Sequence, residues 1–198
     1  AMLAVYVLWP WVAPPFAWGL LLVAACIMLA VNARPRLSET WPEIAVSLAG
    51  LLLYMCTLAP TVLPADSGEF QLVSYLLGVA HPPGYPLYTL LGKLFTLLPV
   101  GDVAYRLNLF ATVCGVATLG VVAYSVRRGT GSQAAALVAA VALGLGTTFW
   151  AQSTTANIRS LTALFTSLCL ALLLRWGEER STRQLVALGI CFGLGVGH

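Results

Sequence analysis

Long apolar runs separated by short polar segments constrain this chain more than any other feature of its sequence. A transmembrane helix needs about 20 consecutive apolar residues, and only helices and closed barrels cross a bilayer with their backbone polar groups paired. The runs are continuous and do not alternate with period two, which argues against a barrel. Only 9% of the residues are charged, whereas soluble domains carry about 25%. The sequence therefore predicts an all-α polytopic transmembrane helix bundle and excludes a soluble or disordered chain.

We expect residues 1–198 to form a single transmembrane domain, the N-terminal part of a longer protein, because the last apolar run stops in mid-helix. The predicted spans lie near residues 16–31, 44–58, 103–126, 134–150, 161–176 and 185–198. Between the second and third spans, the apolar run at 88–98 is too short to cross a bilayer. Prolines interrupt the segment before it. We therefore expect residues 60–102 to form one loop that contains interfacial helices.

Basic residues predict the orientation of the spans, because Lys and Arg favour cytoplasmic loops. If residues 61–101 do not cross the bilayer, one side holds Arg34, Arg36, Arg127, Arg128, Arg175, Arg180 and Arg183. The other side holds Lys93, Arg106 and Arg159. The larger set predicts the cytoplasmic side, which places loop 60–102 on the external face of a bacterial inner (plasma) membrane. The small net charge of +3 gives no basis for a nucleic-acid partner.

Two carboxylates, Asp66 and Glu69, follow the second predicted span. Charges near a bilayer are costly, so a pair of carboxylates there needs a polar purpose. Their spacing resembles that of a capping box, in which Asp66 caps a helix and Glu69 occupies its third position. The same geometry suits catalysis, and the spacing leaves both open. A divalent metal ion at the pair is allowed but not required, and the five cysteines show no metal-type spacing.

A proline-rich turn follows at His81–Pro86. Its three prolines fix the backbone and remove three hydrogen-bond donors, so the turn holds one shape. Taken alone, His81 is more typical of a hydrogen-bonded interfacial histidine than of a ligand or a proton shuttle. The turn gains a functional interpretation only if it lies beside Asp66.

Three groups of residues together resemble a known family. They are Leu58–Thr61 with Asp66–Phe70, Val79–Tyr88, and Tyr105–Leu109. Across roughly residues 55–165 the chain resembles a bacterial membrane family, long known as a domain of unknown function, that is grouped with GT-C glycosyltransferases and related to an animal endoplasmic-reticulum O-mannosyltransferase. The resemblance implies a GT-C-like fold, a sugar linked to polyprenyl phosphate as donor, and an inverting transfer on the external face. It implies no certain cofactor.

The resemblance also implies roles for single residues. Asp66 matches the acidic residue that acts as base on the acceptor, and Glu69 is the second acid of that motif. Arg106 is the nearest cation on that side, and a guanidinium fork stabilises a phosphate leaving group well. The expected substrate-binding set is His81, Tyr85, Arg106 and Asn108. Alternatives stay open, because Arg106 can snorkel to the headgroups, Asn108 can bond a neighbouring helix and Tyr85 can join an aromatic belt.

One segment departs from the family pattern. Where the family usually has an acidic residue followed two places later by a tyrosine, this chain has Asn157 and Arg159. An amide cannot act as a base in the way a carboxylate does. Two hypotheses therefore stand. The chain is an active membrane hexosyltransferase, or it is a catalytically inactive accessory subunit, derived from a GT-C enzyme, that joins partner membrane subunits.

Overall fold

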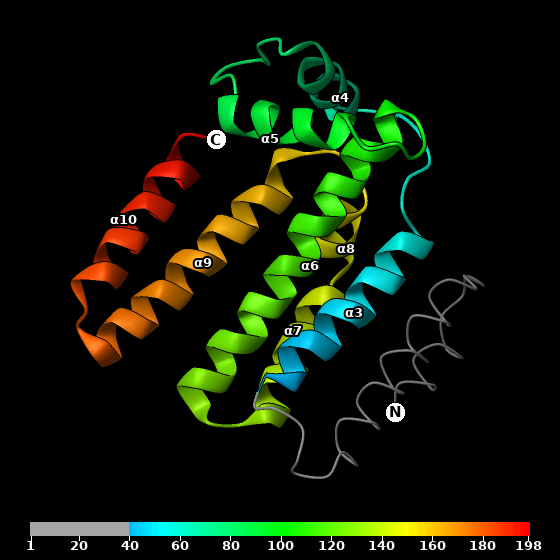
Figure 1. Ribbon diagram of the computed structural model, residues 1–198. Coiled ribbons are helices and arrows are strands. Elements are labelled where there is room, and N and C mark those ends of the chain that lie inside the picture. The colour runs from blue at the N-terminus through cyan, green and yellow to red at the C-terminus, as the bar shows by residue number, and fades with distance from the viewer. Residues whose placement is uncertain (1–39) are drawn as a thin grey trace, which may run out of the picture.

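Helix α6 (Val103–Thr130) is the long central element of the computed structural model, which describes residues 40–198. Asp102 caps its first turn by accepting a hydrogen bond from the Tyr105 N–H at 2.8 Å. At the other end Gly131 adopts a positive φ of 69°, which stops the helix. Figure 1 shows the rest of the bundle: α3 (Trp41–Cys56), α7 (Gln133–Gly144), α9 (Ile158–Glu179) and α10 (Thr182–Val196).

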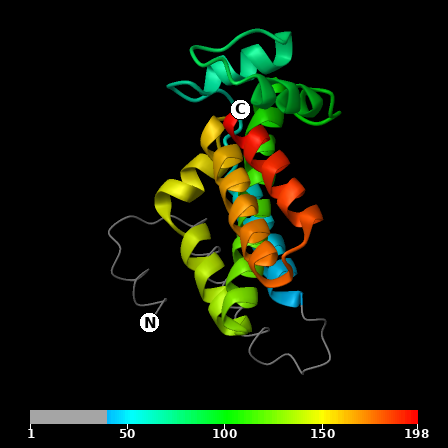
Figure 2. The same cartoon turned by 90° about the vertical axis from the view of Figure 1, so that its left-hand side faces the viewer.

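Helices α4 (Ser67–Leu76) and α5 (Pro86–Thr96) lie across one end of the bundle, as Figure 1 and the side view in Figure 2 show. A proline begins α5, where a missing N–H costs nothing. Helices α4 and α5 thus stay at one end of the bundle. The described residues contain α-helices and no strand, so the predicted all-α membrane bundle is confirmed. The span predicted at 16–31 lies outside the described residues.

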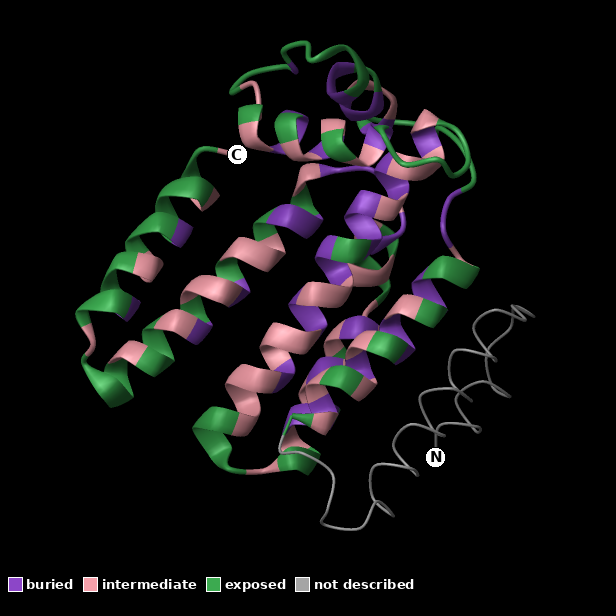
Figure 3. Cartoon of the chain, viewed as in Figure 1, coloured by how far each residue is buried: buried purple, intermediate pink, exposed green. Residues whose placement is uncertain are grey.

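Among the described residues, two helices, α6 and α9, are long and apolar enough to cross a membrane, and a third span exists if the bent pair α7 and α8 (Thr147–Ser153) counts as one. Helices α3 and α10 are apolar but shorter. The outer faces of the bundle are coloured as exposed in Figure 3, and their large apolar side chains include Leu48, Leu52, Val138, Leu170, Ile190 and Phe192. Such faces suit contact with lipid.

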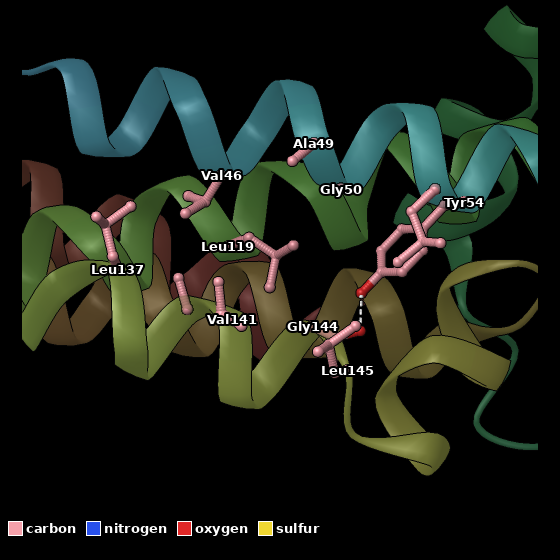
Figure 4. A pocket seen from close by; sticks show the side chains of 11 residues that line it. Val46, Ala49, Gly50, Tyr54, Leu119, Leu137, Val141, Gly144 and Leu145 are labelled. Carbon is pink, nitrogen blue, oxygen red and sulfur yellow. Dashed lines mark hydrogen bonds between the residues drawn. The ribbon is translucent and has the colours of Figure 1, made fainter. Parts of the chain in front are cut away.

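The span predicted at 134–150 is not one straight helix, because α7 and α8 meet at an angle of 72°. Tyr54 on α3 stabilises the bend between α7 and α8. Its hydroxyl donates a buried hydrogen bond of 2.8 Å to the carbonyl of Gly144, the last residue of α7 (Figure 4). Backbone groups at membrane depth need such partners inside the protein. The apolar cavity beside Tyr54 has a volume of only about 30 Å³, so it is packing space and not a substrate site.

Ion pairs hold the end of the bundle that lies away from α4 and α5. Arg127 Nε lies 2.7 Å from Glu43 Oε1 and joins α6 to α3, and Arg128 Nε lies 2.7 Å from Glu178 Oε2 and joins α6 to α9. The basic residues of this end are Arg127, Arg128, Arg175, Arg180 and Arg183. The opposite end carries Lys93, Arg106 and Arg159. The described basic residues therefore divide between the two ends as the sequence predicts, and Arg34 and Arg36 lie outside the described part.

Helix α6 packs closely against α8 at Gly115. The Thr112 hydroxyl donates to the Ser153 carbonyl at 2.7 Å. A Cβ atom on Gly115 would lie 2.3 Å from the Ser153 Oγ atom and 2.7 Å from its Cβ atom. Only a glycine fits there unless α8 moves, because backbone and Cβ atoms cannot rotate away as a long side chain can.

We expect Gly115→Ala to destabilise the protein by about 1–3 kcal/mol, because the added methyl overpacks the contact with α8. Thermal unfolding in detergent, followed by tryptophan fluorescence, measures the effect. Gly129→Ala on the same helix is the matched control, since nothing lies within 4 Å of its new Cβ. That control is expected to unfold at the same temperature as the parent or higher. Equal unfolding temperatures for the parent and Gly115→Ala would contradict the close contact.

Candidate functional site

A polar pocket with a volume of about 340 Å³ lies at the end of the bundle that carries α4 and α5. It is built by the segment before α4, the proline-rich turn, and the connection from α8 to α9. Its lining residues are Leu63, Pro64, Ala65, Asp66, Ser67, Phe70, His81, Tyr85, Gln152, Thr155, Ala156, Asn157, Ile158 and Arg159. Of the site residues that the sequence predicts, the polar pocket brings together Asp66, His81 and Tyr85.

Asp66 occupies the N-cap position of α4, but its side chain makes no capping hydrogen bond. Ser67 stabilises this turn instead, because its hydroxyl donates to the Leu63 carbonyl at 2.6 Å and accepts from the Leu63 N–H at 3.3 Å. Within the described residues, the Asp66 carboxylate has no hydrogen bond and no ion pair. Asp66 thus stands at the N-cap position without capping the helix, and its carboxylate is available inside the pocket.

Glu69 is directed toward the proline-rich turn. Its Oε1 accepts from the His81 backbone N–H at 2.6 Å, and its Oε2 lies 2.8 Å from His81 Nδ1. The side-chain hydrogen bond from His81, followed by the backbone one, holds the pKa of Glu69 below its usual value of 4.5. The His81 ring also packs against Phe70 and Tyr85, with ring centroids 5.7 and 5.4 Å apart. Glu69 therefore fixes the turn that lines the pocket and is not itself a lining residue.

Asn108, which the sequence assigns to substrate binding, does not line the pocket. Its side chain is 1% exposed and makes hydrogen bonds with three separate segments. Its Nδ2 donates to the carbonyls of Ala59 and Thr61 at 2.8 and 3.2 Å, and its Oδ1 accepts from Gln71 Nε2 and from the Ala156 N–H at 3.1 and 2.8 Å. These bonds use both donors and both acceptor positions of the amide. Asn108 holds the walls of the pocket together and has no capacity left for a sugar.

Arg106 is likewise placed outside the pocket. Its guanidinium donates to the carbonyls of Thr96, Val100 and Gly101 at 2.7, 2.7 and 2.9 Å. These carbonyls belong to the end of α5 and the turn after it, where helical acceptors lack partners. In this structure the Arg106 side chain therefore ties α5 to α6.

The connection from α8 to α9 supplies residues that sequence reasoning underestimated. Asn157 caps α9, because its Oδ1 accepts from the N–H groups of Arg159 and Ser160 at 2.9 and 3.3 Å. An asparagine directly before an apolar run is a common N-cap signal, and the sequence contained it. Arg159 lines the pocket with an exposed side chain, and its Nη1 donates to Gln152 Oε1 at 3.2 Å. The departure from the family pattern thus supplies the pocket with a cation.

The pocket offers a poor set of ligands for a divalent metal ion. Both oxygens of Glu69 accept from His81, and Asp66 is the one carboxylate among the lining residues. No group of three or more His, Cys, Asp or Glu residues in the described part of the chain is arranged to hold a metal ion. Hard cations need several oxygen ligands, so we derive no role for a metal at Asp66 and Glu69.

Residues 66–198 match the family described as the N-terminal domain of the protein O-mannosyl-transferase TMEM260, and the match covers more than half of the chain. The chain belongs to this family. The TMEM260 protein O-mannosyl-transferase of Mus musculus is 38% identical over 143 residues, which are 72% of this chain and 20% of that protein. The one of Dictyostelium discoideum is 39% identical over 67 residues, which are 32% of this chain and 8% of that protein. No solved structure matches.

Membership in the TMEM260 family confirms the predicted relation to an animal O-mannosyltransferase for the N-terminal part. The chain spans about a fifth or less of the length of these relatives. The matched residues begin at Asp66 and include every lining residue of the polar pocket except Leu63, Pro64 and Ala65. Most of the pocket lining therefore lies in the region that defines the family.

We expect the contribution of Glu69 to stability to depend on pH. Its native pKa is depressed, so the contribution is present above the ordinary value of 4.5 and is lost as pH falls through the native pKa. Glu69→Gln should lower the unfolding temperature at neutral pH, and the difference from the parent should shrink as pH falls below that value. Unfolding scans of both proteins over a pH series measure this. A difference that stays constant at acid pH would contradict the contact with His81.

Proposed function

We propose that this chain is the N-terminal catalytic part of a GT-C-type membrane glycosyltransferase, which transfers a sugar from a polyprenyl-phosphate donor to an acceptor hydroxyl. Family membership supports a transferase, and the pocket at the end of an apolar bundle supports a lipid-linked donor. The relatives are named protein O-mannosyl-transferases, so mannose and a protein hydroxyl are the first donor sugar and acceptor to test.

The observation that carries the proposal is the state of Asp66, a carboxylate that lines the pocket without a capping hydrogen bond. In the proposed reaction the acceptor oxygen attacks the anomeric carbon, and the Asp66 carboxylate takes the proton of the hydroxyl. The bond from the anomeric carbon to the phosphate oxygen breaks, and polyprenyl phosphate leaves with the bonding electrons. Attack opposite the leaving group inverts the anomeric carbon.

Glu69 and His81 act as positioning residues in this proposal. Their paired hydrogen bonds fix the proline-rich turn, which presents His81 and Tyr85 to the pocket. Tyr85 adopts a left-handed backbone conformation with φ of 45°, which directs the chain from the turn into α5. An aromatic ring and an imidazole at the wall of a pocket suit contact with a sugar ring and its hydroxyl groups.

We place the pocket on the external face of the membrane. Five of the seven described arginines lie at the opposite end of the bundle, and the positive-inside rule assigns that end to the cytoplasm. The proposed location is the inner membrane of a bacterium. Lipid-linked sugar donors are anchored in the membrane, so an external pocket beside lipid-facing helices gives them access from the bilayer.

We expect Asp66→Asn in the full-length protein to reduce sugar transfer by about 10²–10⁴-fold, because the amide cannot accept the proton. The unfolding temperature should stay unchanged, since the Asp66 side chain makes no capping bond. Asp102→Asn is the matched control, because Asp102 is an N-cap outside the pocket and an asparagine caps equally well. Transfer from radiolabelled polyprenyl-phosphate mannose to a peptide acceptor measures the effect.

Full transfer activity of the Asp66→Asn protein would contradict the proposed role of Asp66 as the base. Absence of transfer by the parent protein from every donor tried, together with stoichiometric co-purification of other membrane proteins, would favour the accessory-subunit hypothesis over the enzyme. Activity in the parent and in Asp102→Asn that is lost only in Asp66→Asn is the expected pattern.

A further inference from the structure

Arg159 differs from the other described cations at its end of the bundle. Lys93 Nζ donates to the Tyr75 carbonyl, and Arg106 donates to three carbonyls. The Arg159 guanidinium has one hydrogen bond to a described residue, from Nη1 to Gln152 Oε1, and no ion pair in that part of the chain. Most of its donors therefore have no acceptor among residues 40–198, while its side chain is exposed and lines the polar pocket.

A second concavity meets the polar pocket at this residue. It has a volume of about 290 Å³, its walls are largely apolar, and it is lined by Thr148, Phe149, Gln152, Ser153, Arg159 and Ser160. We call it the α8–α9 hollow. The polar pocket and the α8–α9 hollow share Gln152 and Arg159. These two side chains thus stand between a polar space that contains Asp66 and an apolar space on α8, the second arm of the bent apolar pair.

We propose that Arg159 binds the phosphate of a polyprenyl phosphate, with the head group in the polar pocket beside Asp66 and the first part of the prenyl chain in the α8–α9 hollow. This inference rests on the proposed function and names the residue that receives its donor. Such a ligand is polar at one end, anionic in the middle and apolar at the other. These three parts match the polar pocket, Arg159 and the α8–α9 hollow in that order.

In this proposal the Arg159 side chain binds the phosphate, and the backbone N–H groups at the N-terminus of α9 do not. The N–H groups of Arg159 and Ser160 already bond to Asn157 Oδ1, so the helix terminus is occupied by its own cap. A guanidinium offers a planar fork that matches two phosphate oxygens. Gln152 Oε1 holds Nη1 at 3.2 Å and orients the fork, and the Gln152 side chain lines both spaces as well.

The test measures binding, not transfer, with the full-length protein in phosphatidylcholine nanodiscs. The probe is radiolabelled polyprenyl phosphate without a sugar. The competitors are polyprenol of the same chain length, inorganic phosphate and mannose 1-phosphate. The variants are Arg159→Gln and Arg159→Lys, with Lys93→Gln as the matched loss of one positive charge at the same end of the bundle.

We expect Arg159→Gln to weaken polyprenyl phosphate binding about tenfold or more, because a charge-assisted bidentate contact is lost. The affinity of Arg159→Lys for polyprenyl phosphate should lie between those of the parent and Arg159→Gln. The affinity of Lys93→Gln should equal that of the parent. Polyprenol should compete weakly and equally in all variants. Equal affinity of the parent and Arg159→Gln for polyprenyl phosphate, or equal weakening by Lys93→Gln, would overturn the site.

A second variant tests the lipid chain. Thr148→Trp fills the α8–α9 hollow from an exposed position on α8, so it should weaken the binding of polyprenyl phosphate about tenfold. The affinity for mannose 1-phosphate, measured by competition, should stay unchanged. If inorganic phosphate or mannose 1-phosphate binds as tightly as polyprenyl phosphate and Thr148→Trp changes nothing, the site takes a soluble phosphate and the lipid assignment is wrong.

The two proposals fail in different ways. Binding that depends on Arg159, with no transfer from any donor, would overturn the proposed function and leave the lipid-phosphate site. Transfer that depends on Asp66, with unchanged binding in Arg159→Gln, would overturn the site and leave the function.

Discussion

The buried amide of Asn108 is the contact on which the polar pocket depends. It sits on α6 and joins the segment after α3, helix α4 and the segment before α9 through the Ala59, Thr61, Gln71 and Ala156 groups. The Ala59 carbonyl, the Gln71 side-chain amide and the Ala156 N–H form buried hydrogen bonds with Asn108. A buried polar group without a partner costs more than a typical hydrogen bond gains. Because one side chain satisfies all three segments, the pocket walls are held in a fixed relation although they are far apart in sequence.

The bend between α7 and α8 also shapes the site. A straight helix over 134–150 would continue along the bundle, whereas the bend directs α8 and its connection to α9 toward the pocket. Tyr54 stabilises the bend by donating a hydrogen bond to the Gly144 carbonyl. The close fit of Gly115 against Ser153 then holds α8 on α6. Packing inside the apolar bundle thus determines where Gln152 and Arg159 lie.

The sequence predicted the elements better than the contacts. Apolar run length identified α6 and α9, and the prolines indicated the break between α4 and α5. The motif around Asp66 indicated a residue that the structure places in a pocket. Asn108 and Arg106 were assigned to substrate because residue type alone does not reveal which backbone carbonyls will face a side chain. Arg159 was taken as a departure from a pattern, since the sequence does not reveal that the start of α9 and the segment before α4 line the same pocket.

Determination of the structure of the full-length protein with a non-hydrolysable polyprenyl-phosphonate sugar is the most direct test of the claim that the polar pocket is a donor site. We predict density for the sugar between Asp66 and Tyr85, the phosphonate at Arg159, and the first prenyl units along Phe149. A donor bound elsewhere on the protein, with the polar pocket empty and Arg159 unchanged in its contact with Gln152, would contradict that claim.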